Sequence, residues 1–196
     1  MISSEGSRLG EQAARRLAQI GRYEIGPGLT DAELDRIERE YELEFADDHR
    51  AFLSAGLPFG VPREKGQPWP DWRDGDPGDL RRQLDWPIEG VLFDVESNAF
   101  WQLAWGQRPA DSGKALSLAR WHLARAPKMI PVYGHRYLPA GHGTYGHPVL
   151  SIYQTDIIVY GTDLASYIDS EFSGSGVVIS PAWTPPPMVP FWSDFL

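Results

Sequence analysis

The sequence predicts an α+β fold: a central, mainly antiparallel sheet with helices before it and one helix after it, in a single domain. Three observations lead to this prediction. Apolar residues recur at helical spacing in the N-terminal part of the chain. Short β-branched and aromatic runs separated by turn residues follow, which is typical of hairpins. Finally, residues 149–153 and 157–160 form a hairpin pattern that leads directly into a helical pattern at 164–172, with Thr162 or Asp163 as its cap.

Three segments are distinguished along the chain. Residues 1–28 form an N-terminal helical extension, in which 7–23 is expected to be an amphipathic helix. Residues 29–172 form the main α+β domain. Residues 173–196 hold a short strand pattern at 177–179 and a tail rich in proline and aromatic residues, which we expect to pack on the domain.

Cap residues position the first two helices of the main domain. Thr30 and Glu33 form a capping-box pattern at the start of one helix. Asp47 or Asp48 is expected to cap a short third helix, and Gly56 to end it.

The middle of the chain alternates between strand, loop and helix patterns. Its expected elements are an ordered loop at 57–78 that is pinned by buried tryptophans, a hairpin of strands 90–95 and 99–105, a helix at 112–126, a strand at 129–133, and a loop at 134–147. We expect seven strand residues to supply much of the core: Phe93, Phe100, Val132, Leu150, Ile152, Ile157 and Val159.

Composition and charge exclude several classes of protein. The chain has no cysteine, so it cannot hold a disulfide, a thiolate zinc site or a cysteine nucleophile. Its formal net charge of −9 argues against a phosphate-binding surface, and we expect no nucleic-acid partner. The sequence shows neither a signal peptide nor an apolar run of membrane-spanning length, so we expect no membrane partner and a cytoplasmic location.

Several segments resemble the SUKH superfamily, of the Smi/Knr type. In the run LTDAELDRIEREYELEFADDHRAFLSAG, six residues match the opening of that family: Leu34, Glu38, Phe45, Phe52, Leu53 and Gly56. Ala46 stands where the family usually has proline, and His49 where it usually has tyrosine. The later segments GVLFDVESNAFW, MIPVYGHRYLP and PVLSIYQTDIIVYGTDLASYI are similar to a bacterial branch of the superfamily, so the resemblance covers roughly residues 29–172.

The resemblance implies a mixed α+β fold with a central antiparallel sheet and a role in protein binding. Members of this branch often act as immunity proteins that neutralise a toxin, and they share no catalytic residues. From this resemblance we expect a non-enzymatic protein-binding domain that acts as an immunity protein, with a toxin domain as its partner. We expect no cofactor.

The histidines allow a different hypothesis. His135, His142 and His147 lie in the loop at 134–147, with His122 before it and Asp156 after it, so a small-molecule or metal-dependent enzyme could use this loop. The spacings match no standard metal motif, however, and we expect no metal site.

Two features concern binding. Asp94 and Glu96 would point to the same side of a strand, either as paired carboxylates for acid and base chemistry or as residues at the end of a hairpin strand that pair with Arg or cap a turn. Aromatic residues in loops are frequent anchors of interfaces. The candidate partner-binding residues are therefore Trp69, Trp72, Asp94, Glu96, His135, Tyr137 and Asp156.

The proline-rich tail offers a third hypothesis. Residues 187–190 form a PxxP string, which could recruit the chain as an adaptor to an SH3-like groove.

Overall fold

The computed structural model describes residues 3–59, 69–174 and 191–196. The helices are α1 (Ser4–Ile20), α2 (Asp31–Tyr41), α3 (Asp47–Ala55), α4 (Pro77–Ser97), α5 (Ser112–Leu123) and α6 (Leu164–Phe172), with single 3₁₀ turns at Leu103–Trp105 and Trp192–Phe195. The strands are β1 (Glu24–Gly26), β2 (Leu57–Phe59), β3 (Met129–Tyr133), β4 (Arg136–Pro139), β5 (Val149–Tyr153) and β6 (Asp156–Gly161). None of the helices described is long and apolar enough to cross a lipid bilayer.

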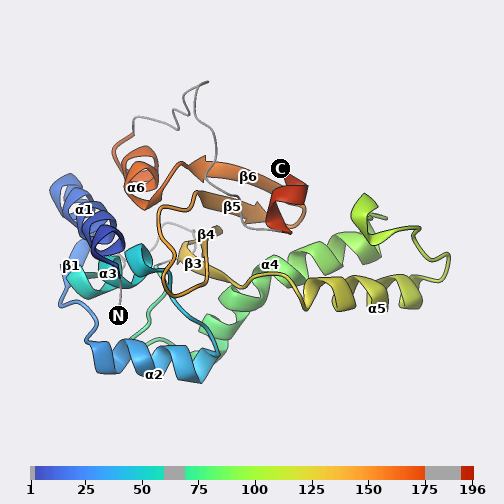
Figure 1. Ribbon diagram of the computed structural model, residues 1–196, viewed down its shortest axis with the longest axis horizontal. Helices are drawn as coiled ribbons and strands as arrows, with labels where there is room; N and C mark the ends of the chain where they lie inside the picture. Colours follow the sequence, from blue (N-terminus) through green and yellow to red (C-terminus); the bar gives the residue numbers. More distant parts are fainter. Residues whose placement is uncertain (1–2, 60–68, 175–190) are drawn as a thin grey trace.

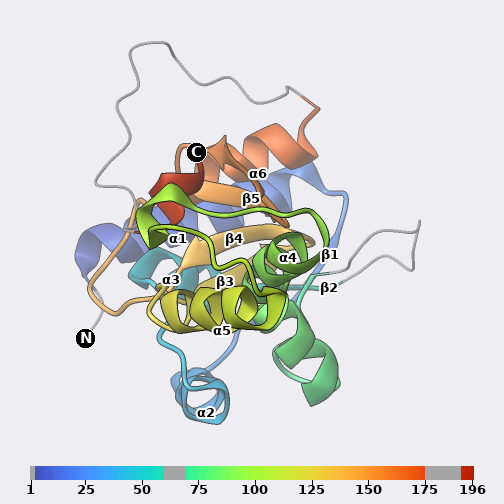
Figure 2. The same cartoon turned by 90° about the vertical axis from the view of Figure 1, so that its right-hand side faces the viewer.

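In the described residues, two antiparallel sheets and six helices confirm the α+β prediction. β1 pairs with β2, and the larger sheet has the order β3-β4-β5-β6. In Figure 1, α1 and α3 lie at one end of this sheet, and α5 with the second half of α4 reaches out at the other end. Figure 2 views the molecule from that second end, with α5 in front.

The N-terminal helices follow the predicted caps closely. Thr30 Oγ1 accepts from the Glu33 N–H, and the Glu33 carboxylate accepts from the Thr30 N–H, so the capping box of α2 is confirmed. α1 packs on α3 and α6. Gly10 lies in the α1–α3 contact, and Ala13 and Leu17 are fully buried.

The core consists of two clusters. The first joins the N-terminal helices to α6 and one side of the large sheet. The second lies between α4, α5 and the sheet, and Trp192 is buried in it, with its Nε1 donating to the Pro127 carbonyl at 2.8 Å. Six of the seven predicted core residues lie in these clusters or pack against them: Val132, Leu150, Ile152, Ile157, Val159 and Phe100. Phe100 is half-buried against the second cluster.

The predicted hairpin of strands 90–95 and 99–105 is wrong. Residues 90–97 belong to α4, which begins at the N-cap Asp76 and has Pro77 in its first turn, and residues 99–105 hold only a 3₁₀ turn. Because the period is helical, Phe93 turns away from the core and is 48% exposed, so its predicted core position is also wrong.

Pro87 lies inside α4, and a tyrosine from the sheet compensates for it. A proline has no N–H to donate to the carbonyl four residues earlier, here that of Gln83. The hydroxyl of Tyr137, on β4, donates to this Gln83 carbonyl at 2.9 Å. The helix therefore continues past Pro87 with the freed acceptor satisfied from outside.

This contact gives a testable prediction. Replacing Tyr137 by phenylalanine should lower the free energy of unfolding by about 1–2 kcal/mol, because the buried Gln83 carbonyl would lose its donor. Urea unfolding measures the loss, and Tyr153→Phe, at an exposed tyrosine, should change stability by less than about 0.5 kcal/mol. Equal losses in both variants would contradict the compensation.

Five smaller expectations need correction or lie partly or wholly outside the described residues. Neither Asp47 nor Asp48 caps α3, whose N-cap is Ala46, because both carboxylates bind other backbone groups. The predicted loop 134–147 contains β4. Residues 60–68 of the predicted loop 57–78, the strand pattern 177–179 and the PxxP string are outside the described ranges.

Candidate functional site

The seven residues predicted to bind a partner do not form one surface. Trp69, Trp72 and Tyr137 are buried in the core clusters. Trp69 stacks on Phe172 with ring centroids 5.3 Å apart, and Trp72 lies edge-on to Phe45 at 5.4 Å. These three side chains have almost no exposed area with which to contact a partner.

Asp94 is also buried, and it joins α4 to the β5–β6 turn. Its carboxylate accepts from the Thr155 N–H at 3.0 Å, from Thr155 Oγ1 at 2.6 Å and from Asn98 Nδ2 at 2.6 Å. Burial alone would raise the pKa of Asp94, but these hydrogen bonds outweigh it and hold the pKa below its ordinary value. Gly90 allows the close approach, since a Cβ there would lie 3.0 Å from the Gln154 Cα. The turn is thus fixed on the helix.

Around this turn lies a surface of exposed aromatic and acidic side chains. We call it the acidic-aromatic face, and it comprises Trp86, Glu89, Phe93 and Glu96 of α4 with Tyr153 and Asp156 of the β5–β6 hairpin. The α4 residues are spaced so that they share one side of the helix.

Exposure and contacts support treating these residues as one face. Trp86, Phe93 and Tyr153 are 37%, 48% and 53% exposed. The Trp86 and Tyr153 rings are 6.1 Å apart, and Tyr153 is paired directly with Asp156 in the hairpin. Glu96 and Asp156 of the predicted set thus belong to this face. His135, whose ring is 6.1 Å from that of Tyr153, borders it.

The histidines of residues 134–147 do not converge. His142 contacts Glu38 at 3.1 Å, between Nε2 and Oε1, whereas His135 faces Tyr153. His147 is half-buried, and burial lowers its pKa. Within the described ranges, no three His, Asp or Glu side chains are placed to hold a metal ion together.

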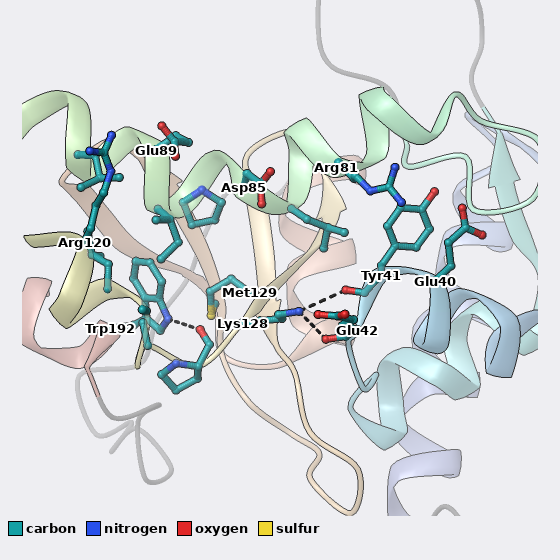
Figure 3. Close-up of a pocket in the computed structure, with 18 residues that line it drawn as sticks. Glu40, Tyr41, Glu42, Arg81, Asp85, Glu89, Arg120, Lys128, Met129 and Trp192 are labelled. Atoms are coloured by element: carbon teal, nitrogen blue, oxygen red, sulfur yellow. Dashed lines mark hydrogen bonds between the residues drawn. The ribbon is translucent and has the colours of Figure 1, made fainter. Parts of the chain in front are cut away.

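A groove of about 620 Å³ lies between the end of α2, α4, the end of α5 and β3 (Figure 3). Apolar side chains form much of it: Leu84, Pro87, Ile88, Leu92, Leu123, Met129 and Trp192. Its volume is in the range of small-molecule sites.

Some polar groups of the groove already contact other parts of the chain. Lys128 Nζ donates to the carbonyls of Tyr41 and Glu42, at 3.2 and 2.5 Å, and so caps the C-terminal end of α2. The Arg81 guanidinium lies 5.5 Å from the centre of the Tyr41 ring. Asp85 and Glu89 stand on the α4 side in Figure 3. Its described lining has no histidine, serine or threonine.

Four consecutive polar residues, 47–50, are buried at the start of α3. Asp47 accepts from the N–H groups of Ser3 and Gly143, at 2.7 and 3.0 Å. Asp48 accepts from the Gly146 N–H at 2.8 Å. Together they hold the loop that follows β4, and Asp47 also holds the start of α1. The sequence pattern predicts Asp47 or Asp48 as a cap and gives no signal for this role.

The ionisable groups of this buried cluster differ in their pKa shifts and in their ion pairs. Burial raises the pKa of Asp48 to about 6, although hydrogen bonds from Gly146 and His49 N–H groups oppose the rise. Burial lowers the pKa of His49 to about 3, and its Nδ1 has no hydrogen-bond partner. Arg50 pairs with Asp35 and Glu38, at 2.8 Å each. The cluster connects α2, α3 and the loop after β4, and we assign it a structural role.

Comparison of the chain with protein-family models, with curated proteins and with solved structures finds no match.

Proposed function

We propose that this chain is a non-enzymatic protein-binding domain of the SUKH type, and that it acts as an immunity protein that occludes a toxin domain. The observation that carries the proposal is the acidic-aromatic face. Three exposed aromatic rings, those of Trp86, Phe93 and Tyr153, are grouped there, and tryptophan and tyrosine are among the residues that most often dominate binding energy at interfaces.

The face is held in place before a partner arrives. Asp94 fixes the β5–β6 turn on α4, and Gly90 allows the two to approach closely. Because these side chains stand on a helix and a hairpin joined by buried hydrogen bonds, binding would order little of the chain. Such preorganisation reduces the entropic cost of association.

Charge indicates the chemistry of the partner. Glu89, Glu96 and Asp156 are exposed, and none of them forms an ion pair with another described residue. Together with the net charge of −9, they favour a basic surface on the toxin. Such complementarity speeds encounter, and the association rate should therefore fall as salt concentration rises.

A protection assay tests the proposal. Each polymorphic toxin domain encoded in the genome of the source cell is expressed in bacteria with and without this chain, and survival is measured. We expect one toxin to be neutralised. The double variant Trp86→Ala/Phe93→Ala should weaken binding of that toxin about 10- to 100-fold and lose protection, because it removes two exposed anchors.

Leu103→Ala is the matched control, because Leu103 is 90% exposed and lies outside the face. It should protect as the parent chain does. Urea unfolding of all variants verifies that they stay folded. Protection from no toxin, or full protection by the double variant, would overturn the proposal.

A further inference from the structure

A second charged surface, of opposite sign, lies on α5. We call it the basic stripe, and it consists of Lys114, Leu118, Trp121 and Arg125. Their spacing of four, three and four residues places them along one side of the helix, and the buried residues Ala115, Ala119 and Leu123 lie on the other side. Arg125 lies two residues beyond Leu123, the last residue of the helix.

The stripe presents aromatic area and positive charge together. Trp121 is 53% exposed, and the Arg125 guanidinium lies 3.6 Å from the centre of its ring. Arg125 Nη1 also donates to the Trp121 carbonyl, which fixes the guanidinium over the ring. Arginine stacked on tryptophan keeps donors free for carboxylates.

This part of the chain departs from the overall charge. Residues 106–128 contain five Lys or Arg and a single acid, Asp111, giving a formal charge of +4. Since the whole chain carries −9, the remaining residues carry −13. The described part of the chain therefore presents a basic, aromatic surface and an acidic, aromatic surface.

We propose that the chain associates with itself, the basic stripe of one copy docking on the acidic-aromatic face of another. Lys114 and Arg125 meet Glu89 and Glu96 of the second copy, and Trp121 packs against its exposed rings. The occupant is a second copy because both complementary surfaces are present on the same chain, each with uncompensated charge and exposed aromatic area.

The geometry determines the type of assembly. The two surfaces are different, so the contact is heterologous, and each docked copy leaves one surface free for the next. Mass should therefore keep increasing with concentration unless the assembly closes into a ring. The inference does not rest on the proposed function, although a toxin bound to the acidic-aromatic face would compete with self-association.

Sedimentation velocity and light scattering of the full chain, from micromolar to millimolar concentration at about 0.15 M salt, test the inference. At this salt the overall repulsion between copies is screened beyond about 8 Å, whereas contacts between the two surfaces remain. We expect the average mass to rise above the 22.0 kDa of one chain.

Charge reversal identifies the surfaces. Lys114→Glu/Arg125→Glu should stay at the mass of one chain, and so should Glu89→Lys/Glu96→Lys. An equimolar mixture of the two variants should associate again, because a parental basic stripe then meets a parental acidic face and the two reversed surfaces also match.

Arg22→Glu/Arg39→Glu is the matched control. It gives the same net charge as the first variant, at exposed arginines outside both surfaces, and should associate as the parent chain does. A parent chain that stays at the mass of one chain at every concentration would overturn the inference. An equal loss of self-association in the control would also overturn it, as would a mixture of the two variants that does not associate. None of these readouts involves a toxin, so failure here is distinct from failure of the proposed function.

Discussion

Replacing Gly10 by alanine is expected to lower the free energy of unfolding by about 2 kcal/mol. A Cβ at this position of α1 would lie 2.1 Å from the Asp48 carbonyl oxygen, 2.7 Å from the Ala51 Cβ and 2.7 Å from the Phe52 nitrogen. Two of these atoms are backbone of α3, so the two helices must separate. That separation costs more than the roughly 1 kcal/mol of helix propensity that alanine gains over glycine.

Gly113→Ala is the matched control for this prediction. Gly113 also lies in a helix, α5, but an added Cβ would meet only the Asp111 side chain, at 3.4 Å. It should leave stability unchanged or raise it by up to about 1 kcal/mol. Urea unfolding compares the two variants with the parent chain. If both variants gain stability, α1 does not depend on close contact with α3.

The sequence predicted helices and hairpins correctly where the conformation that neighbouring residues favour is also the one that packing in the fold requires. The box at Thr30 and Glu33, the 149–161 hairpin and the helix that Asp163 caps are all formed by neighbours in sequence. Their hydrogen bonds involve residues only a few positions apart, so the local sequence pattern is enough to predict these elements.

α4 shows where this agreement fails. The segment 90–95 is rich in β-branched and aromatic residues, and Pro87 and Gly90 look like breaks in a helix. Both are tolerated for reasons that lie far away in sequence: the Tyr137 hydroxyl satisfies the carbonyl that Pro87 leaves free, and Gln154 packs against Gly90. The Asp76-Pro77 start was the local signal that could have indicated a helix.

The candidate surfaces were only partly predictable for the same reason. Composition indicated that aromatic residues would bind a partner, but which rings are exposed depends on packing. Trp69 and Trp72 are buried, whereas Trp86 and Phe93 are exposed because their segment is a helix rather than a strand. The basic stripe, in contrast, follows from helical spacing in α5, which was predicted as a helix at 112–126 and ends at Leu123.

The buried pair Asp48 and His49 should give opposite pH dependences of stability when each is replaced. The folded-state pKa of His49, about 3, is below its ordinary 6.5. The unfolded chain therefore binds more protons in this range, and His49 makes the fold less stable as pH falls, by about 2 kcal/mol between pH 7 and pH 5. The folded-state pKa of Asp48, about 6, is above its ordinary 3.8. Here the folded chain binds the extra proton, and Asp48 makes the fold more stable over the same interval, by about 1 kcal/mol.

In the parent chain these two effects partly cancel, so only the variants separate them. Relative to the parent, stability should fall more steeply from pH 7 to pH 5 in Asp48→Asn, which keeps an oxygen to accept from the Gly146 N–H. It should rise instead in His49→Gln. Urea unfolding at pH 5, 6 and 7 measures the slopes, and Asp156→Asn, at an exposed carboxylate, should run parallel to the parent. If the free energy of unfolding changes with pH equally in all three variants and the parent, folding does not shift the pKa of Asp48 or of His49. The cluster at the start of α3 would then be open to water.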